Sequence, residues 1–156
     1  MSIEDDISLL SQVPTLAMLG PQALRILAIG TESRYVPSGQ VLFYAGDPAD
    51  GGYVIQDGQF LLEPGTPADG HEEITAGPGT LLGELALMTD TVRPATATAL
   101  EPSTVIRISR NLFMKMLEGY PSAAKKLRDL LAERVDQWTR EITNVKRVLD
   151  IPDERG

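Results

Sequence analysis

Short apolar runs alternate with glycine, aspartate and proline through the middle of the chain. Ten of the 14 glycines lie between Gly39 and Gly83, so breaks recur every few residues. The runs between them are rich in β-branched and aromatic side chains, which favour strands. The predicted strands are residues 41–44, 53–55, 60–62, 73–75, 96–100 and 104–108. Short strands separated by such turns predict a compact antiparallel roll or barrel.

Helical spacing replaces this pattern on both sides of the strands. Before them, apolar residues recur at helical intervals, and breaks around Pro14 and Pro21 divide them into two short amphipathic helices. After the strands, Ser109 is placed to cap a helix that runs through Leu117 and ends at Gly119.

A long C-terminal helix is predicted to begin at Pro121 and to reach about Leu149. Its apolar residues are spaced by three and four, and the last five follow a heptad seam. The apolar positions are Leu127, Leu131, Val135, Trp138, Ile142, Val145 and Leu149. This seam suggests a homodimer through the C-terminal helix.

These elements together predict an α+β, mainly β fold. The expected architecture is an eight-strand antiparallel β-roll (a double-stranded β-helix, jelly-roll-like), flanked by N-terminal helices and a long C-terminal helix. The whole chain, 1–156, is expected to form a single domain, which is the size that one apolar core supports. The N-terminal helices would cover 1–32, the roll 33–108 and the C-terminal helices 109–150.

The charge of the chain argues against a DNA-binding surface. The net charge is −8, and residues 1–120 hold 15 acidic against 6 basic side chains. Neutralising phosphates along a nucleic acid needs clustered lysine and arginine, which this acidic body lacks. We therefore expect no DNA partner.

Composition also bears on compartment and on catalysis. The chain has no cysteine, an acidic N-terminus and no long apolar run, so we expect a cytoplasmic protein without a membrane partner. It has one histidine, His71, which disfavours a metal-dependent enzyme on a β-roll. No nucleophile–base pair stands out, so we expect no catalytic residues and no metal site.

Candidate chemistry is concentrated in residues 81–99. Gly83 can adopt backbone angles that other residues avoid and lets a ligand approach closely. Residues 84–88 can form one helical turn, whose N–H groups attract an anion. Arg93, nine residues after Glu84, supplies a planar cation for phosphate oxygens, and Glu84 can accept sugar hydroxyls. This combination is typical of a sugar-phosphate site.

The order Gly-Glu-Leu-Ala-Leu, five residues, then Arg-x-Ala-Thr resembles the phosphate-binding cassette of cyclic nucleotide-binding domains. That family includes the catabolite activator protein, protein kinase A regulatory subunits and cyclic-nucleotide-gated channels. The resemblance extends upstream and covers roughly residues 7–148, with the cassette at 82–96. The matching upstream positions are Val13, Pro14, Pro37, Gly39, Leu42, Gly46, Asp47, Asp50, Tyr53, Val54, Ile55 and Gly58.

The resemblance implies a role for each cassette residue. Glu84 would accept a hydrogen bond from the ribose 2′-hydroxyl, Arg93 would pair with the cyclic phosphate, and the Ala86 N–H would assist. Gly83 would let the sugar approach, with Leu85 or Leu87 packed beneath it. The C-terminal helix would act as a lid over the base. The expected ligand-binding residues are Gly83, Glu84, Leu85, Ala86, Arg93, Pro94 and Ala95.

Pro94 departs from the family pattern, in which alanine, serine or threonine commonly follows the arginine. Proline has no N–H, so one backbone donor to the phosphate is missing, at a cost of about 1–3 kcal/mol. Relatives selective for cGMP often have a hydroxyl at this position. Its absence favours cAMP as the ligand, with cGMP as the alternative.

The sequence thus predicts a bacterial cyclic-nucleotide sensor that catalyses nothing. Because the sequence given ends soon after Leu149, we expect no effector domain in it, and output through self-association or a separate effector protein. The first alternative is an interaction or dimerisation module of the same fold that has lost useful nucleotide affinity, for which Pro94 is the best argument. A small enzyme and a DNA-binding regulator are the less favoured alternatives.

Overall fold

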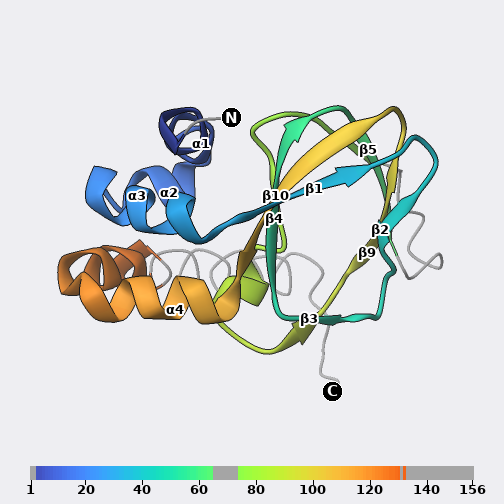
Figure 1. Ribbon diagram of the computed structural model, residues 1–156. Helices are drawn as coiled ribbons and strands as arrows, with labels where there is room; N and C mark the ends of the chain where they lie inside the picture. The colour runs from blue at the N-terminus through green and yellow to red at the C-terminus, as the bar shows by residue number, and fades with distance from the viewer. Residues whose placement is uncertain (1–2, 65–73, 131, 133–156) are drawn as a thin grey trace, which may run out of the picture.

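The computed structural model describes residues 3–64, 74–130 and 132. Helices gather on one side of the molecule and the strands form a roll on the other (Figure 1). The described part contains three helices, then ten strands with a short 3-10 helix among them, then helix α4, and residues 121–130 are helical as well. The predicted α+β fold with helices on both flanks of a β-roll is confirmed.

The N-terminal helices are α1 (Ile3–Leu10), α2 (Pro14–Ala17) and α3 (Pro21–Gly30). Pro14 and Pro21 occupy the first positions of α2 and α3, where a missing N–H breaks no helical hydrogen bond. The sequence pattern predicted two helices here. The structure has three because Pro14 opens a four-residue helix of its own.

Eight strands form two four-stranded sheets within the described residues, and their pairings are antiparallel. The first sheet has the order β1 (Glu32–Val36), β10 (Ser103–Ser109), β4 (Gly51–Asp57) and β7 (Leu81–Leu82). The second has the order β2 (Val41–Phe43), β9 (Ala95–Ala99), β5 (Phe60–Pro64) and β6 (Ile74–Ala76). A further short antiparallel pair joins β3 (Pro48–Ala49) to β8 (Thr91–Val92).

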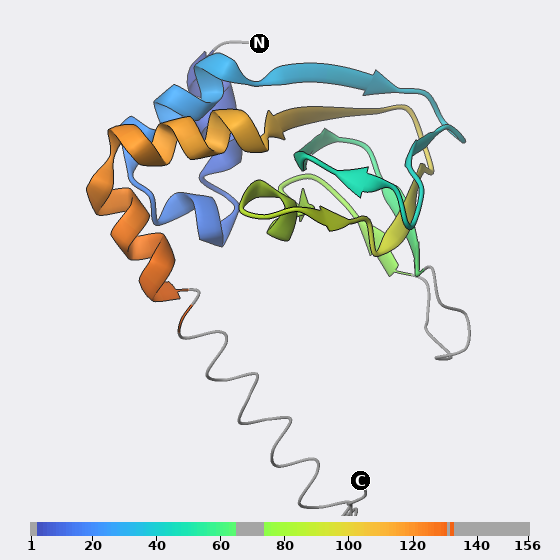
Figure 2. The same ribbon diagram turned by 90° about the horizontal axis from the view of Figure 1, so that it is seen from below.

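Strand β1 has no counterpart among the strands that the apolar pattern predicted. Four of its five residues are exposed, and Val36 alone is buried, so it lacks the alternation that marks a half-buried strand. It forms because its backbone pairs with β10 from Glu32 opposite Arg107 to Val36 opposite Ser103. The two strands run side by side along one edge of the roll in Figure 2.

The central strands of the first sheet, β4 and β10, are buried on both faces and lie between two hydrophobic cores. Alternate residues of its central strands β4 and β10 point to opposite sides. Val54, Ile106 and Ile108 pack against the helices. Tyr53, Ile55 and Val105 instead line the interior of the roll, where they meet Val36, Leu42, Phe60, Ala97 and Ala99 from the other strands.

Helix α4 (Arg110–Gly119) follows β10 directly, and the Ser109 side chain caps it by accepting from Leu112 N at 3.1 Å. Residues 121–130 form the predicted start of the C-terminal helix. The predicted continuation to Leu149, with its heptad seam, lies outside the described residues, as does His71. No helix in the described ranges is long and apolar enough to cross a membrane.

Candidate functional site

The cassette runs from β7 through a glycine into a tight helical turn and returns along β8. Gly83 has φ +90°, which side chains of L-residues rarely tolerate. The expected turn is the 3-10 helix η2 (Leu85–Leu87), with Glu84 at its N-cap. In this turn the Ala86 N–H donates to the Gly83 carbonyl at 3.0 Å, so that N–H already has a partner within the cassette.

Gly83 lies directly against the guanidinium of Arg93. A Cβ built at Gly83 would lie 2.4 Å from Arg93 Nη1 and 3.1 Å from the Gly51 carbonyl oxygen. These two atoms leave no room for the methyl group of an alanine at residue 83. The absence of a side chain at residue 83 therefore lets the cassette backbone touch both strand β4 and the cation.

Arg93 is a charged residue turned into the roll. It is only 5% exposed, and its guanidinium carbon lies 4.5 Å from the Phe43 ring centroid and 5.4 Å from that of Tyr53. Both distances are in the range of cation–π attraction. Its backbone is held from both sides, because the Arg93 N–H donates to the Asp47 carbonyl at 2.8 Å and the Arg93 carbonyl accepts from the Gly46 N–H at 2.7 Å.

One nitrogen of this guanidinium is unsatisfied. Arg93 Nη1 is buried and has no hydrogen-bond partner among the residues that the structure describes. Burial lowers the pKa of Arg93, although the nearby Tyr53 and Asp50 act in the opposite direction. Because arginine keeps its proton in proteins, the result is a buried positive charge with a free donor.

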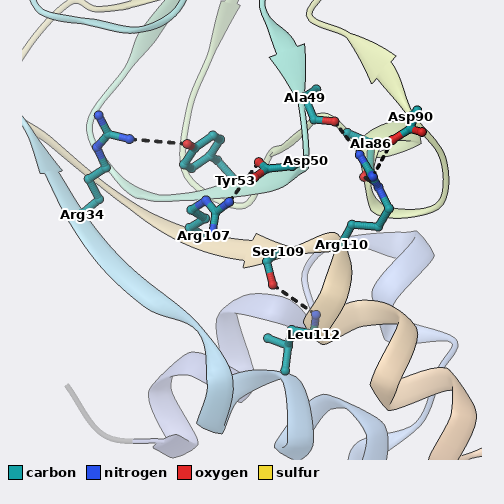
Figure 3. A network of polar contacts seen from close by, with 10 residues as sticks. All are labelled: Arg34, Ala49, Asp50, Tyr53, Ala86, Asp90, Arg107, Ser109, Arg110 and Leu112. Atoms are coloured by element: carbon teal, nitrogen blue, oxygen red, sulfur yellow. Dashed lines mark hydrogen bonds and ion pairs between the residues drawn. The ribbon is translucent and has the colours of Figure 1, made fainter.

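The acidic neighbour of Arg93 is bound to a second arginine. Arg107 Nη2 donates to Asp50 Oδ1 at 2.9 Å, and this hydrogen bond lowers the pKa of Asp50. The exposed Arg34 lies nearby, with its Nη1 3.4 Å from the Tyr53 hydroxyl oxygen (Figure 3). Asp50 thus interacts with two cations, Arg107 through a hydrogen bond and Arg93 through its charge.

A cavity of about 240 Å³ opens between the cassette and the segment that follows it. Its walls are Ala49, residues 83–86 and residues 91–94. Small-molecule sites usually measure about 300–1,000 Å³, so this cavity lies just below the lower end of that range.

Six of the seven residues expected from the sequence line this cavity. Ala95 does not, because it begins β9, where it pairs with Pro64 of β5. Of the two leucines expected beneath the sugar, Leu85 is 59% exposed at the cavity, whereas Leu87 is buried against the helices. Pro94 is exposed on the rim.

Glu84 connects the cavity to the N-terminal helices. Its Oε2 accepts a hydrogen bond from the hydroxyl of Thr15 on α2. Glu84 also lines a second cavity of about 290 Å³, together with Thr15, Thr80 and the chain around them. Glu84, which the sequence analysis assigned to sugar binding, therefore lines both cavities, and its carboxylate accepts a hydrogen bond from helix α2.

Arg110 connects the cavity to helix α4. Its side chain donates to the Ala86 carbonyl at 3.1 Å, to the Ala49 carbonyl at 2.7 Å and to Asp90 Oδ1 at 2.7 Å (Figure 3). Ala49 and Ala86 both line the cavity. The first residue of α4 is thereby bonded to two cavity walls and to the loop after η2.

Sequence reasoning missed both Thr15 and Arg110. A cation in the first turn of a helix opposes the helix dipole, so Arg110 carried a weak signal that it serves something other than the helix. Thr15 carried none, since one threonine in a helix is ordinary. Within the described residues no group of three or more His, Cys, Asp or Glu side chains could hold a metal ion.

Comparison with known proteins gives a consistent result. Residues 33–120 match the family model of the cyclic nucleotide-binding domain. A cyclic nucleotide-binding-like protein from Brucella abortus bv. 1 str. 9-941 is 40% identical, with a TM-score of 0.63 over 73% of this chain and 98% of its own. The N-terminal domain of a transcriptional regulator from Streptomyces coelicolor A3(2) is 27% identical, with a TM-score of 0.76 over 86% of this chain and 94% of its own.

Curated relatives are much longer than this chain. An uncharacterized NTE family protein from Mycobacterium tuberculosis is 34% identical over 112 residues, which make up 72% of this chain and 19% of that protein. The chain thus spans about a fifth of that relative's length.

Proposed function

The chain belongs to the family of cyclic nucleotide-binding domains, and we propose that it binds a cyclic nucleotide, cAMP in the first place, in the cavity that Gly83, Glu84 and Arg93 line. The observation that carries this proposal is the buried Nη1 of Arg93, which has no partner among the described residues. A buried donor without a partner costs free energy. A phosphate oxygen supplies the charged acceptor that a guanidinium prefers.

The proposed roles of the other residues follow the family resemblance and the cavity walls. Glu84 accepts a hydrogen bond from a ribose hydroxyl, the Gly83 backbone borders the sugar, and Leu85 gives it an apolar wall. Ala86 and Pro94 border the phosphate, with Ala95 behind them. The Ala86 N–H is bonded to Gly83, so a phosphate would share that donor with the turn.

Preference for cAMP over cGMP rests on Pro94. This residue sits on the cavity rim and offers neither a hydroxyl nor an N–H. Arg93 therefore carries most of the phosphate recognition, and we expect a modest affinity. The proposal involves no chemical step.

A sensing role is part of the proposal. Arg110 bonds two cavity walls to α4, so a ligand that displaces those walls also acts on that helix. A ligand shifts such an equilibrium only by its different affinities for the two states. The output would pass to a second copy of the chain or to a separate effector.

Calorimetric titration of the full chain with cAMP and with cGMP tests the proposal. The wild type should bind cAMP more tightly than cGMP, and Arg93→Ala should weaken cAMP binding about 10- to 100-fold because one charge-assisted hydrogen bond is lost. Arg25→Ala is the matched control, because Arg25 is half exposed and pairs with Glu4 on the surface. It should leave affinity unchanged.

The leading alternative is an interaction module that keeps the fold without useful nucleotide affinity. Pro94 and the occupied Ala86 N–H are the observations in its favour. Absence of heat with either nucleotide, from protein whose thermal unfolding is cooperative, would favour that alternative and reject ours.

A further inference from the structure

Thr15 joins the N-terminal helices to the carboxylate of the cassette residue Glu84. It lies on α2, is 3% exposed, and donates its hydroxyl to Glu84 Oε2 across a sequence separation of 69 residues. Buried threonine hydroxyls need an acceptor, and here the acceptor is the carboxylate proposed to bind ribose.

Glu84 needs such a tether to hold one orientation. Its side chain lies between the cavity beside Arg93 and the second cavity beside Thr80, so it has space on both sides. A glutamate side chain has several rotatable bonds, whereas a buried β-branched side chain has few χ1 rotamers available. The hydrogen bond from Thr15 therefore restricts the orientation of the Glu84 carboxylate.

The bond leaves the carboxylate able to accept again. An ionised carboxylate has two oxygens and about four acceptor positions, of which the Thr15 hydroxyl uses one. A sugar hydroxyl can then donate to a carboxylate that is already oriented, and the ligand does not have to pay for that ordering.

We propose that Thr15 is a positioning residue for recognition of the ribose 2′-hydroxyl and acts through Glu84. The inference rests on the proposed function. It makes the N-terminal helices part of the specificity of the site, since the discrimination between ribose and deoxyribose depends on a side chain from α2.

The test compares cAMP with 2′-deoxy-cAMP on wild type, Thr15→Val and Thr15→Ser by calorimetry of the full chain. Valine matches threonine in shape and lacks the hydroxyl, while serine keeps it. The ratio of the two affinities should fall about 3- to 10-fold in Thr15→Val, as expected for one hydrogen bond, and should be largely retained in Thr15→Ser. Thermal unfolding of each variant monitors the fold.

A double-mutant cycle separates positioning from general damage. In a Glu84→Ala background, Thr15→Val should not change the affinity ratio further, because the group through which it acts is absent. An equal loss for both ligands, with the ratio unchanged, would overturn the role of Thr15, and so would a ratio that rises. Absence of binding by the wild type is a distinct result, which would overturn the proposed function and this inference with it.

Discussion

At the scale of single residues, Arg93 is hard to explain by folding alone. Its charge is almost fully buried, and one of its nitrogens has no partner in the described part of the chain. The rings of Phe43 and Tyr53 return some of the lost solvation through cation–π attraction, typically about 0.5–2 kcal/mol. The remaining deficit is typical of a site where stability is given up for binding.

Gly83 should be needed for binding as well as for folding. Gly83→Ala adds a Cβ that would lie 2.4 Å from Arg93 Nη1 and forces alanine into φ +90°. Gly39→Ala carries the same kind of backbone penalty at φ +84°, with nothing within 4 Å of the added atom. We expect Gly39→Ala to lower the free energy of unfolding by about 1–2 kcal/mol and to leave nucleotide affinity unchanged.

Gly83→Ala should cost more stability than its control and should also weaken nucleotide binding, because the guanidinium has to move. Urea unfolding and calorimetric titration of both variants measure the two effects. Equal losses of stability with unchanged affinity in both variants would contradict the close contact between Gly83 and Arg93.

At the residue scale, the sequence could predict which side chains lie close together only where they are near one another along the chain. Gly83, Glu84 and Arg93 lie within eleven residues, so their proximity follows from a short turn. The contacts of Glu84 with Thr15 and of Arg93 with Phe43 join distant segments. No spacing rule reveals such contacts, because they depend on how the helices dock on the roll.

At the scale of elements, Arg110 joins α4 to the cassette. Placing a cation in the first turn of a helix opposes the helix dipole, and the three acceptors of its side chain offset that cost. Two of these acceptors are the backbone carbonyls of the buried residues Ala49 and Ala86. The third, Asp90, is 96% exposed and is screened by solvent.

The contributions of these acceptors should therefore be unequal. Arg110→Met removes the guanidinium that donates to the Ala49 and Ala86 carbonyl oxygens. It should lower the free energy of unfolding by about 1–3 kcal/mol. Asp90→Asn removes only an exposed ion pair and should cost less than about 1 kcal/mol. Urea unfolding of the two variants checks the order, and a loss in Asp90→Asn as large as in Arg110→Met would contradict it.

Elements with a clear apolar period were predicted well, and the others were not. The strands that became β2, β4, β5, β6, β9 and β10 and the Ser109 cap of α4 follow from local chemistry. Strand β1 was missed because it is exposed on most of its length, and β3, β7 and β8 because two residues carry no period. The boundaries given for the domain and the dimer through the C-terminal helix stay predictions.

At the scale of the whole molecule, the cavity lies where the roll meets the helices. It is connected to α2 through the bond between Glu84 and Thr15 and to α4 through Arg110. Both connections start from residues that line the cavity. Direct hydrogen bonds thus connect the cavity walls to both α2 and α4, as the proposed sensing role requires.

The negative net charge of the chain limits how an anionic ligand could bind to it. With a net charge of −8, the chain as a whole repels an anionic ligand at long range. Binding of a cyclic phosphate then has to come from short-range contacts, and the buried guanidinium of Arg93 is the group that offers them.

The most direct measurement follows the side-chain nitrogen resonances of the arginines in a ¹⁵N-edited spectrum of the full chain while cAMP is added. Arg93→Lys identifies the Arg93 signals by their absence. The account predicts that these signals shift with saturation, as the free Nη1 gains a phosphate partner, while those of exposed Arg25 stay in place. Saturable binding of cAMP with the Arg93 signals unmoved would contradict it.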